Sequence, residues 1–444
     1  MNSLNTSYKN ILKITAPLVI AGIAMNLVGV IDIMLVTGLG EAEVGGTGNG
    51  QILYALLFVI GMGFTSGIQI IIGRRNGAHD YKAIGSLFYQ GIYFTVLFAS
   101  LLFIFIQLAI PPILQSIFDS ENVVHFATVY MKMRGWGILF TLTNLLFIAF
   151  FVGTTKTKIL GYFTPFISLL NIVLDVALIN GYGPFPQMGV QGAALASVIS
   201  EASGTLLFIV YTLKFVDLEK YNLNKFISFH WEQTKTILEV ANPIMVQNAI
   251  SIGAWFSFFV IVENLGERAL AISQIIRGIY IFVMVPVFSL ADATNTFVSN
   301  LMGEKNFEKI IPLIVRTTVL GLGINVLFFV SINLFPEFTI GLFSTDAEII
   351  SDSLSTLRLT TFSMFTFTMS FMPFRAVSGT GNTRTALFIE VMGVGLYLIY
   401  AYYVAVVSQM ELHMVWSSEF VYFGVMFVLS WYYLKKGNWA AKEI

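Results

Sequence analysis

Long apolar runs without charge constrain this chain more than any other feature. Three of them are LFASLLFIFIQLAI (97–110), VLFFVSINLF (326–335) and VMGVGLYLIYAYYVAVV (391–407). A helix of about 20 such residues crosses the apolar core of a bilayer. An ordinary soluble domain is about 25% charged, whereas 11% of this chain is charged. The runs predict an all-α polytopic membrane protein, because a β-barrel would show short alternating strands instead.

The placement of charges supports a count of twelve predicted spans. Basic residues such as Arg74, Lys156 and Lys305 follow the even-numbered spans, and the other connections carry mainly Asp and Glu. This alternation is the positive-inside rule, and it predicts that both termini lie in the cytoplasm. The predicted spans are 14–38, 48–73, 86–110, 124–152, 159–181, 188–213, 237–262, 269–299, 313–335, 349–376, 385–408 and 413–434.

An internal repeat divides the chain into two halves. A shift of 226 positions places Pro17 on Pro243, and GTTKTK (153–158) on GTGNTR (379–384). One offset that holds over such a length predicts two homologous six-helix bundles. We expect an N-terminal lobe (1–213), a cytoplasmic linker (214–236) and a C-terminal lobe (237–444). Parallel repeats of this kind place a substrate site between them and permit alternating access.

Three polar residues of the N-terminal half fall at one predicted depth. Asp175 lies about seven residues from the outer end of the fifth span, and Asp32 lies about seven residues from the outer end of the first span. Ser197 lies about eight residues into the sixth span, counted from its outer end. At 1.5 Å per residue, each is roughly 10 to 12 Å from the outer surface. A carboxylate inside the membrane costs roughly 2.5–3.5 kcal/mol, so it usually faces a cavity and serves a function.

Helical spacing adds further residues to this set. Asn171 shares a helix face with Asp175, and Glu201 shares one with Ser197, because each pair is four residues apart. Asn144 is a further candidate. Such oxygen ligands suit a hard cation, and two adjacent carboxylates titrate as a unit. The sequence therefore predicts a site for H⁺ or Na⁺, the alternative being a buried polar network that holds the helices together.

Other polar residues lie within or near predicted spans of the second half. Gln247 and Asn248 are candidates for the lining of a central cavity. Asp292 and Glu390 lie towards the cytoplasmic ends of their spans, where they could gate the inner mouth or form ion pairs. The chain has no cysteine and only scattered histidines, so we expect no metal site beyond Na⁺ at Asp32, Asn171 and Asp175.

The chain resembles the multidrug and toxic compound extrusion (MATE) family over nearly its whole length. The resemblance rests on the early prolines of spans one and seven and on Asp32 in its ID…LG pattern. It continues with the N-x-x-x-D of Asn171 and Asp175, GVQGAALAS (189–197), ENLGERALAISQI (263–275), NLMGEKN (300–306) and AVSGTGNTR (376–384).

The resemblance implies a V-shaped pair of six-helix bundles and export of organic, cationic, amphipathic compounds by antiport with H⁺ or Na⁺. In one prokaryotic branch the cation site uses residues that match Asp32, Asn171, Asp175 and Ser197. Another branch uses a glutamate in span seven, where this chain reads QNAISIGAWFSFF (247–259) without an acid. The resemblance therefore implies a cation site in the N-terminal lobe and a monomeric transporter of the bacterial cytoplasmic (inner) membrane.

Other function classes fit the sequence less well. A flippase for a lipid-linked saccharide, from a related superfamily branch, is the alternative transporter, but few Arg and Lys lie inside the spans. The sequence contains no HExxH motif, no cysteine and no paired histidines, so nothing indicates an enzyme. We expect no cofactor. A net charge of −1 argues against nucleic-acid binding. The expected partners are small organic substrates and the lipid bilayer.

Overall fold

The computed structural model describes residues 4–442 and residue 444. The described residues form helices joined by turns and loops, without a strand, so the predicted all-α fold class is confirmed. Two compact units can be separated. The N-terminal unit is Ala16–Met245, and the C-terminal unit combines the described residues up to Thr15 with Val246–Ile444.

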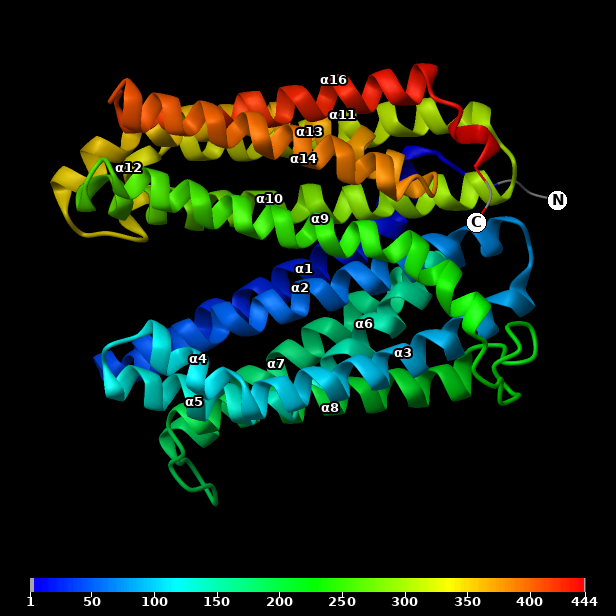
Figure 1. The fold of residues 1–444 in the computed structure, drawn as a ribbon, viewed down its shortest axis with the longest axis horizontal. Coiled ribbons are helices and arrows are strands. Elements are labelled where there is room, and N and C mark those ends of the chain that lie inside the picture. The colour runs from blue at the N-terminus through cyan, green and yellow to red at the C-terminus, as the bar shows by residue number, and fades with distance from the viewer. Residues whose placement is uncertain (1–3, 443) are drawn as a thin grey trace. The chain divides into compact units, whose positions relative to one another are not determined.

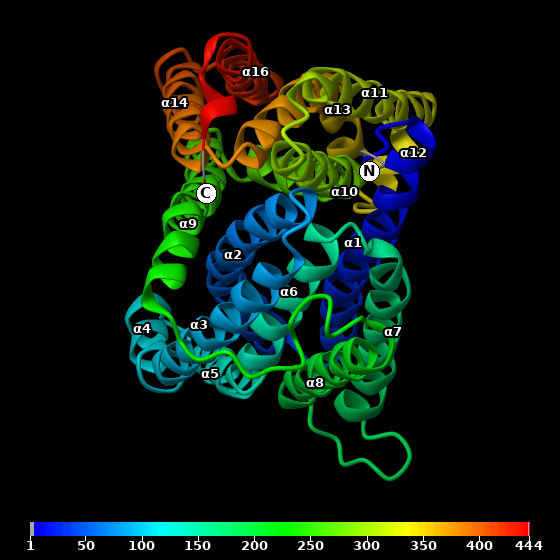
Figure 2. The ribbon, with the colours of Figure 1, turned by 90° about the vertical axis from the view of Figure 1, so that its right-hand side faces the viewer.

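The helices of the N-terminal unit run along a common direction (Figures 1 and 2). In this unit α2 packs against α5 and α6, α3 packs against α6, and α7 packs against α8. The elements are α1 (Tyr8–Thr37, from Ala16 on), α2 (Glu41–Gly77), α3 (Tyr81–Leu108), α4 (Ile110–Ile117), α5 (Glu121–Gly135), α6 (Ile138–Gly153), η1 (Thr157–Ile159), α7 (Leu160–Asn180), α8 (Val190–Phe215) and the first half of α9 (Trp231–Glu263).

The C-terminal unit repeats this pairing. Here α10 and α11 pack against α13, and α14 packs against α16, as the internal repeat requires. The elements are the rest of α9, α10 (Glu267–Gly303), η2 (Phe307–Lys309), α11 (Ile310–Leu334), α12 (Pro336–Gly341), α13 (Ala347–Gly379), α14 (Thr383–Tyr402), the π turn η3 (Tyr403–Val407), α15 (Leu412–Trp416), α16 (Ser418–Lys436) and η4 (Trp439–Ala441).

Two helices pass from one unit to the other. The division falls after Thr15 within α1 and after Met245 within α9. Each helix contains a proline within two residues of its division, Pro17 in α1 and Pro243 in α9. A proline inside a helix removes one backbone hydrogen bond. The repeat-related prolines therefore mark the places where the chain crosses between units.

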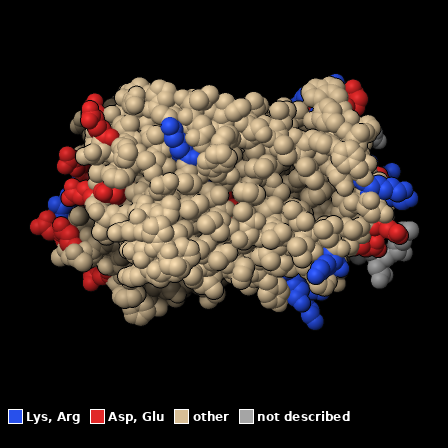
Figure 3. Space-filling view, turned by 90° about the horizontal axis from the view of Figure 1, so that it is seen from below, with Lys and Arg blue, Asp and Glu red and all other residues tan. Residues whose placement is uncertain are grey.

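Most of the predicted spans are apolar helices of the expected length. Among the described residues, ten helices are long and apolar enough to cross a membrane, and α5 with α6 makes an eleventh as a pair bent by 53°. The predicted span 349–376 corresponds to α13, a 33-residue helix whose charged residues and many Ser and Thr lower its hydropathy. Charged side chains gather at the two ends of the face in Figure 3, and the band between them is almost bare of charge.

The bend in the fourth span differs from the single helix predicted over 124–152. It lies at Gly135–Gly137, where two glycines allow close packing. A Cβ on Gly137 would lie 2.9 Å from Glu201 Oε2 and 3.2 Å from Arg134 Nη1. The bend therefore brings the backbone against a charged pair that the linear pattern does not reveal.

A close approach of α7 and α8 sets the level of the polar residues between them. Gly192 of α8 faces the end of α7, where an added Cβ would lie 2.7 Å from the Leu178 carbonyl. Small residues let membrane helices pack backbone to backbone. Gly181 then ends α7 in the left-handed conformation, with φ of 76°. The register that results places Asn171 on α7 beside Ser197 on α8.

Replacement of Gly192 by alanine tests this packing. Because the new methyl group would overlap the α7 backbone, we expect Gly192→Ala to lower the free energy of unfolding by about 1–3 kcal/mol. Gly48 of α2 has no atom within 4 Å of its added Cβ, so Gly48→Ala is the matched control. Denaturant titration in mixed micelles measures both, and equal stabilities would contradict the close approach.

Candidate cation site in the N-terminal unit

Two carboxyl groups meet inside the N-terminal unit. Asp32 of α1 and Asp175 of α7 lie within side-chain hydrogen-bonding distance of each other. Asp175 is fully buried and Asp32 is 6% exposed. A contact between two carboxyl groups becomes a hydrogen bond only when one of them carries a proton, because an ionised carboxylate is acceptor-only. Two carboxyl groups in contact are therefore compatible with a proton or another cation shared between their oxygens.

Asn171 and Ser197 complete a set of four residues around this pair. One orientation of the Asn171 amide pairs both of its polar atoms. In it, Nδ2 donates to Asp175 Oδ2 (3.3 Å) and Oδ1 accepts from the Ser197 backbone N–H (3.1 Å). In the opposite amide orientation, Nδ2 donates to Ser197 Oγ at 3.4 Å. The Ser197 hydroxyl also donates to the Ala193 carbonyl (3.3 Å). The structure thus brings together the four residues predicted for the cation site.

A second buried cluster lies next to this site and is built on an ion pair. Arg134, at the end of α5, donates from Nη1 and Nη2 to the two carboxylate oxygens of Glu201, each at 2.9 Å. Thr141 also donates to Glu201 Oε2 at 2.7 Å. The guanidinium stacks 4.0 Å over the ring of Tyr54. Such two-pronged geometry gives the strongest class of charge-assisted hydrogen bond.

The ion pair keeps the terminal nitrogens of Arg134 from forming salt bridges with Asp32 and Asp175. Arg134 is close enough to Asp32 and Asp175 to interact electrostatically, but its two terminal nitrogens bond Glu201. Neither aspartate forms a salt bridge within the described part of the chain. Asp175 Oδ1 is buried and has no hydrogen-bond donor among the described residues.

These contacts are compatible with a bound cation. The carboxyl groups of Asp32 and Asp175 meet beside the Asn171 amide and the Ser197 hydroxyl, and hard oxygen groups of this kind suit Na⁺ or a proton. The described residues contain no group of three or more His, Cys, Asp or Glu that could hold a metal ion. The assignment of Asp32, Asn171, Asp175 and Ser197 to the coupling cation stays a prediction.

The remaining candidates of the N-terminal unit belong to the ion-pair cluster. Asn144 Nδ2 donates to the Glu201 backbone carbonyl at 2.9 Å, and Thr205 donates to Asn144 Oδ1 at 2.8 Å. Glu201 itself is held by Arg134. Asn144 and Glu201 therefore belong to the ion-pair cluster, and the cavity or gating role predicted for them stays a prediction.

The C-terminal candidates lie in separate polar contacts. Asp292 forms a salt bridge with Arg375. Glu390 is buried and accepts hydrogen bonds from Ser251 (2.5 Å) and Tyr422 (2.7 Å). Gln247, on the same face of α9 as Ser251, is buried and its Oε1 has no partner among the described residues. Asn248 has a polar partner of its own. The roles predicted for these residues in a cavity or gate stay predictions.

Two buried charged residues were not singled out from the sequence. Arg134 stands inside the predicted span 124–152, and Glu419 inside the predicted span 413–434. Glu419 is 4% exposed and accepts a 2.7 Å hydrogen bond from Tyr280. The rule that singled out Asp175, an ionisable residue within an apolar span, would have found both.

The comparisons with known proteins agree with this architecture. The MatE family model matches the chain twice, over residues 17–177 and 243–403. The chain belongs to the MatE family. The starts and the ends of the two matches are each 226 positions apart, which is the offset of the predicted repeat. It is therefore a multi-pass membrane transporter of the MATE type, as the sequence predicted.

Curated relatives cover most of this MatE chain. A probable multidrug resistance protein NorM of Thermotoga maritima is 25% identical over 394 residues, which are 87% of this chain and 83% of the relative. The multidrug export protein MepA of Staphylococcus saprophyticus is 23% identical over 406 residues, 87% of this chain and 84% of the relative.

Solved structures share the fold. An outward-facing multidrug resistance MATE family transporter of the MOP superfamily superposes with a TM-score of 0.89, at 22% identity, and covers 97% of this chain and 96% of its own. A MATE protein in the straight conformation gives a TM-score of 0.88, at 23% identity and 96% coverage of both chains.

Disruption of the Arg134–Glu201 pair tests its structural role. Because either single change leaves a buried partner unpaired, we expect Glu201→Gln and Arg134→Gln each to destabilise by about 3–5 kcal/mol. The double variant Arg134→Met/Glu201→Leu should recover most of that loss, since no charge is stranded. Thermal and denaturant unfolding in detergent measure the series.

Arg268 provides the control, since it forms ion pairs with Glu348 (3.2 Å) and Asp352 (2.7 Å) at an exposed position. We expect Arg268→Gln to cost less than about 1 kcal/mol. Equal losses in Arg268→Gln and Arg134→Gln would contradict a special role of the buried pair.

Proposed function

We propose that this transporter is a secondary active exporter of organic, cationic, amphipathic compounds, driven by antiport with H⁺ or Na⁺. The observation that carries the proposal is the contact between Asp32 and Asp175, two buried carboxyl groups without a salt-bridge partner in the described chain. The export part is supported by relatives named as multidrug resistance and multidrug export proteins.

In this proposal, the coupling ion acts by neutralising the pair. A proton or Na⁺ that enters from outside lies between the oxygens of Asp32 and Asp175, with Asn171 and Ser197 as further ligands. When the ion leaves, the two carboxylates repel each other at close range. Because they stand on different helices, α1 and α7, that repulsion favours a different packing of the two helices.

The first helix provides a route from the ion to the rest of the transporter. Asp32 lies on the part of α1 that belongs to the N-terminal unit, while Tyr8–Thr15 belong to the C-terminal unit. A displacement of α1 at Asp32 therefore acts on a helix whose start is anchored in the other unit. Pro17, next to the division, weakens the helix where it can bend.

We further propose the bacterial cytoplasmic membrane as the location, with both termini in the cytoplasm. The support is the concentration of Lys and Arg on alternate connections and the charge-poor band of Figure 3. We also propose that one chain is the working unit, because the repeat supplies two lobes within one polypeptide.

Efflux from proteoliposomes tests the function. Wild type is reconstituted with a fluorescent organic cation, and proton and sodium gradients are imposed separately. We expect efflux to follow one of the two gradients, and Asp175→Asn to reduce it to the level of protein-free liposomes, because an amide cannot give up or take up the coupling charge. The matched control Asp352→Asn, at an exposed ion pair, should transport like wild type.

The outcomes are distinct. Efflux that is independent of both gradients would contradict antiport and favour a flippase. Full gradient-driven efflux by Asp175→Asn would instead make the pair a structural contact.

The two aspartates are also expected to act as one unit. Residues of a functional unit are strongly non-additive. We therefore expect Asp32→Asn, Asp175→Asn and the double variant to lose gradient-driven efflux to a similar extent. Initial rates at several pH values and sodium concentrations measure this. A double variant much weaker than either single variant would show that the two carboxyl groups act separately.

A further inference from the structure

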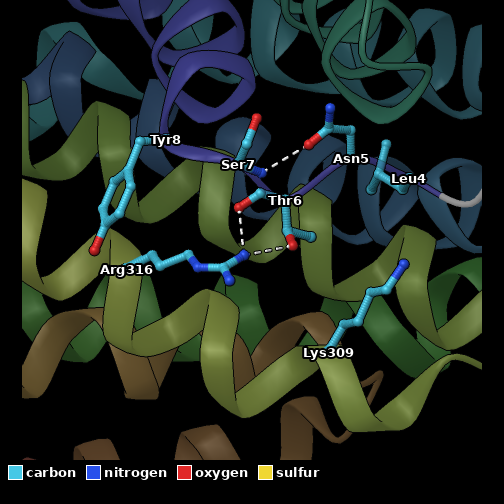
Figure 4. A pocket seen from close by; sticks show the side chains of 7 residues that line it. All are labelled: Leu4, Asn5, Thr6, Ser7, Tyr8, Lys309 and Arg316. Carbon is cyan, nitrogen blue, oxygen red and sulfur yellow. Dashed lines mark hydrogen bonds between the residues drawn. The ribbon is translucent and has the colours of Figure 1, made fainter.

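A pocket lies in the C-terminal unit where the chain begins. It has a volume of about 600 Å³ and is lined by residues 4–8, Lys309 and Arg316. Figure 4 shows the two basic side chains rising from the start of α11 and the preceding η2 towards the N-terminal segment 4–7. All the lining residues belong to one unit. Nothing in the proposed export mechanism uses this pocket.

The N-terminal segment is fixed over the pocket by specific hydrogen bonds. Arg316 Nη1 donates to both the carbonyl and the hydroxyl of Thr6, each at 2.9 Å. Asn5 Oδ1 accepts from the Ser7 N–H at 2.8 Å, and the Leu4 N–H donates to Glu304 Oε1 at 2.8 Å. Residues 4–7 therefore form a wall of the pocket that is held in place by hydrogen bonds.

The electrostatics of the pocket favour an anion. Among the described residues that line the pocket, the charged side chains are Lys309 and Arg316. Glu304, which accepts from the Leu4 N–H, is not part of this lining. Tyr8, also in the lining, is the first residue of α1, and the start of a helix carries a partial positive charge. Thr6 engages one terminal nitrogen of Arg316, and a guanidinium has five N–H donors. It can therefore hold Thr6 and a phosphate oxygen together.

The pocket lies where two candidate membrane spans begin, Tyr8–Thr37 and Phe307–Leu334. Helix ends at the membrane–water boundary meet lipid headgroups, and basic pockets there bind anionic headgroups. An anionic phospholipid is present at this level at far higher local concentration than a soluble anion.

We propose that this pocket binds the phosphate group of an anionic phospholipid headgroup, held by Arg316 and Lys309. Arg316 provides a forked contact to the phosphate oxygens, and Lys309 provides a second positive charge. The bound headgroup would join α11 to the start of α1 through Thr6. The proposal rests on the pocket and its charges, and it stands whether or not the transporter is an antiporter.

Native mass spectrometry of the full chain in detergent tests the proposal. Dioleoyl phosphatidylglycerol, dioleoyl phosphatidylcholine and inorganic phosphate are the three probes. We expect wild type to bind phosphatidylglycerol more tightly than phosphatidylcholine. Arg316→Gln and Lys309→Gln should each weaken phosphatidylglycerol binding about fivefold and leave phosphatidylcholine binding unchanged, because each removes one charge next to the headgroup.

A control variant separates headgroup binding from general surface charge. Arg384→Gln removes an exposed guanidinium of the same unit that does not line the pocket, and it should bind phosphatidylglycerol like wild type. Thermal unfolding of each variant confirms that it is folded.

Three results would overturn the proposal. One is unchanged phosphatidylglycerol binding in both Arg316→Gln and Lys309→Gln. Another is an equal loss in Arg384→Gln, which would indicate general surface charge. The third is displacement of phosphatidylglycerol by inorganic phosphate as effectively as by excess phosphatidylglycerol, which would assign the pocket to a soluble anion.

Discussion

The cost of a charge inside a membrane helix is the constraint on which the rest of the N-terminal unit depends. Each buried carboxylate needs a donor, a counterion or a proton. Glu201 meets this need with Arg134 and Thr141. Asp32 and Asp175 are placed against each other, and the Asn171 amide donates to Asp175 Oδ2. The carboxylate of Glu201 is thus paired within the protein, and the proposed coupling cation would neutralise the two aspartates.

These two arrangements depend on one another. If Glu201 did not hold Arg134, the guanidinium would be free to neutralise the neighbouring aspartates, and a cation would have no advantage there. The bidentate geometry at 2.9 Å keeps the arginine in place. In this account, Arg134 and Glu201 are positioning residues: they keep a fixed positive charge near the site but out of it.

Regular helices explain why the proximity of these residues could be predicted from the sequence. Asp32, Asp175 and Ser197 lie on α1, α7 and α8, each of which is a continuous helix. Counting residues at a rise of about 1.5 Å each therefore grouped side chains that the structure brings together. The i to i+4 spacing likewise placed Asn171 on the face of Asp175. The offset of the predicted repeat is confirmed, because the two family matches are also 226 positions apart.

Features that depend on long-range packing could not be predicted in the same way. Arg134 and Glu201 are 67 residues apart, and the contact needs the bend at Gly135–Gly137. A hydropathy pattern shows the apolar run but not the glycine-dependent approach that bends it. The crossing of α1 between two units was also hidden, because the division falls inside a continuous helix.

The most direct measurement is the release of the coupling cation when substrate binds. Purified protein in detergent is mixed with an organic cation, while a pH indicator follows protons and radioactive sodium follows Na⁺. We expect wild type and Asp352→Asn to release one of these ions on substrate binding, and Asp32→Asn/Asp175→Asn to release neither. Release by the double variant equal to that of wild type would contradict the assignment of the cation to this pair of carboxyl groups.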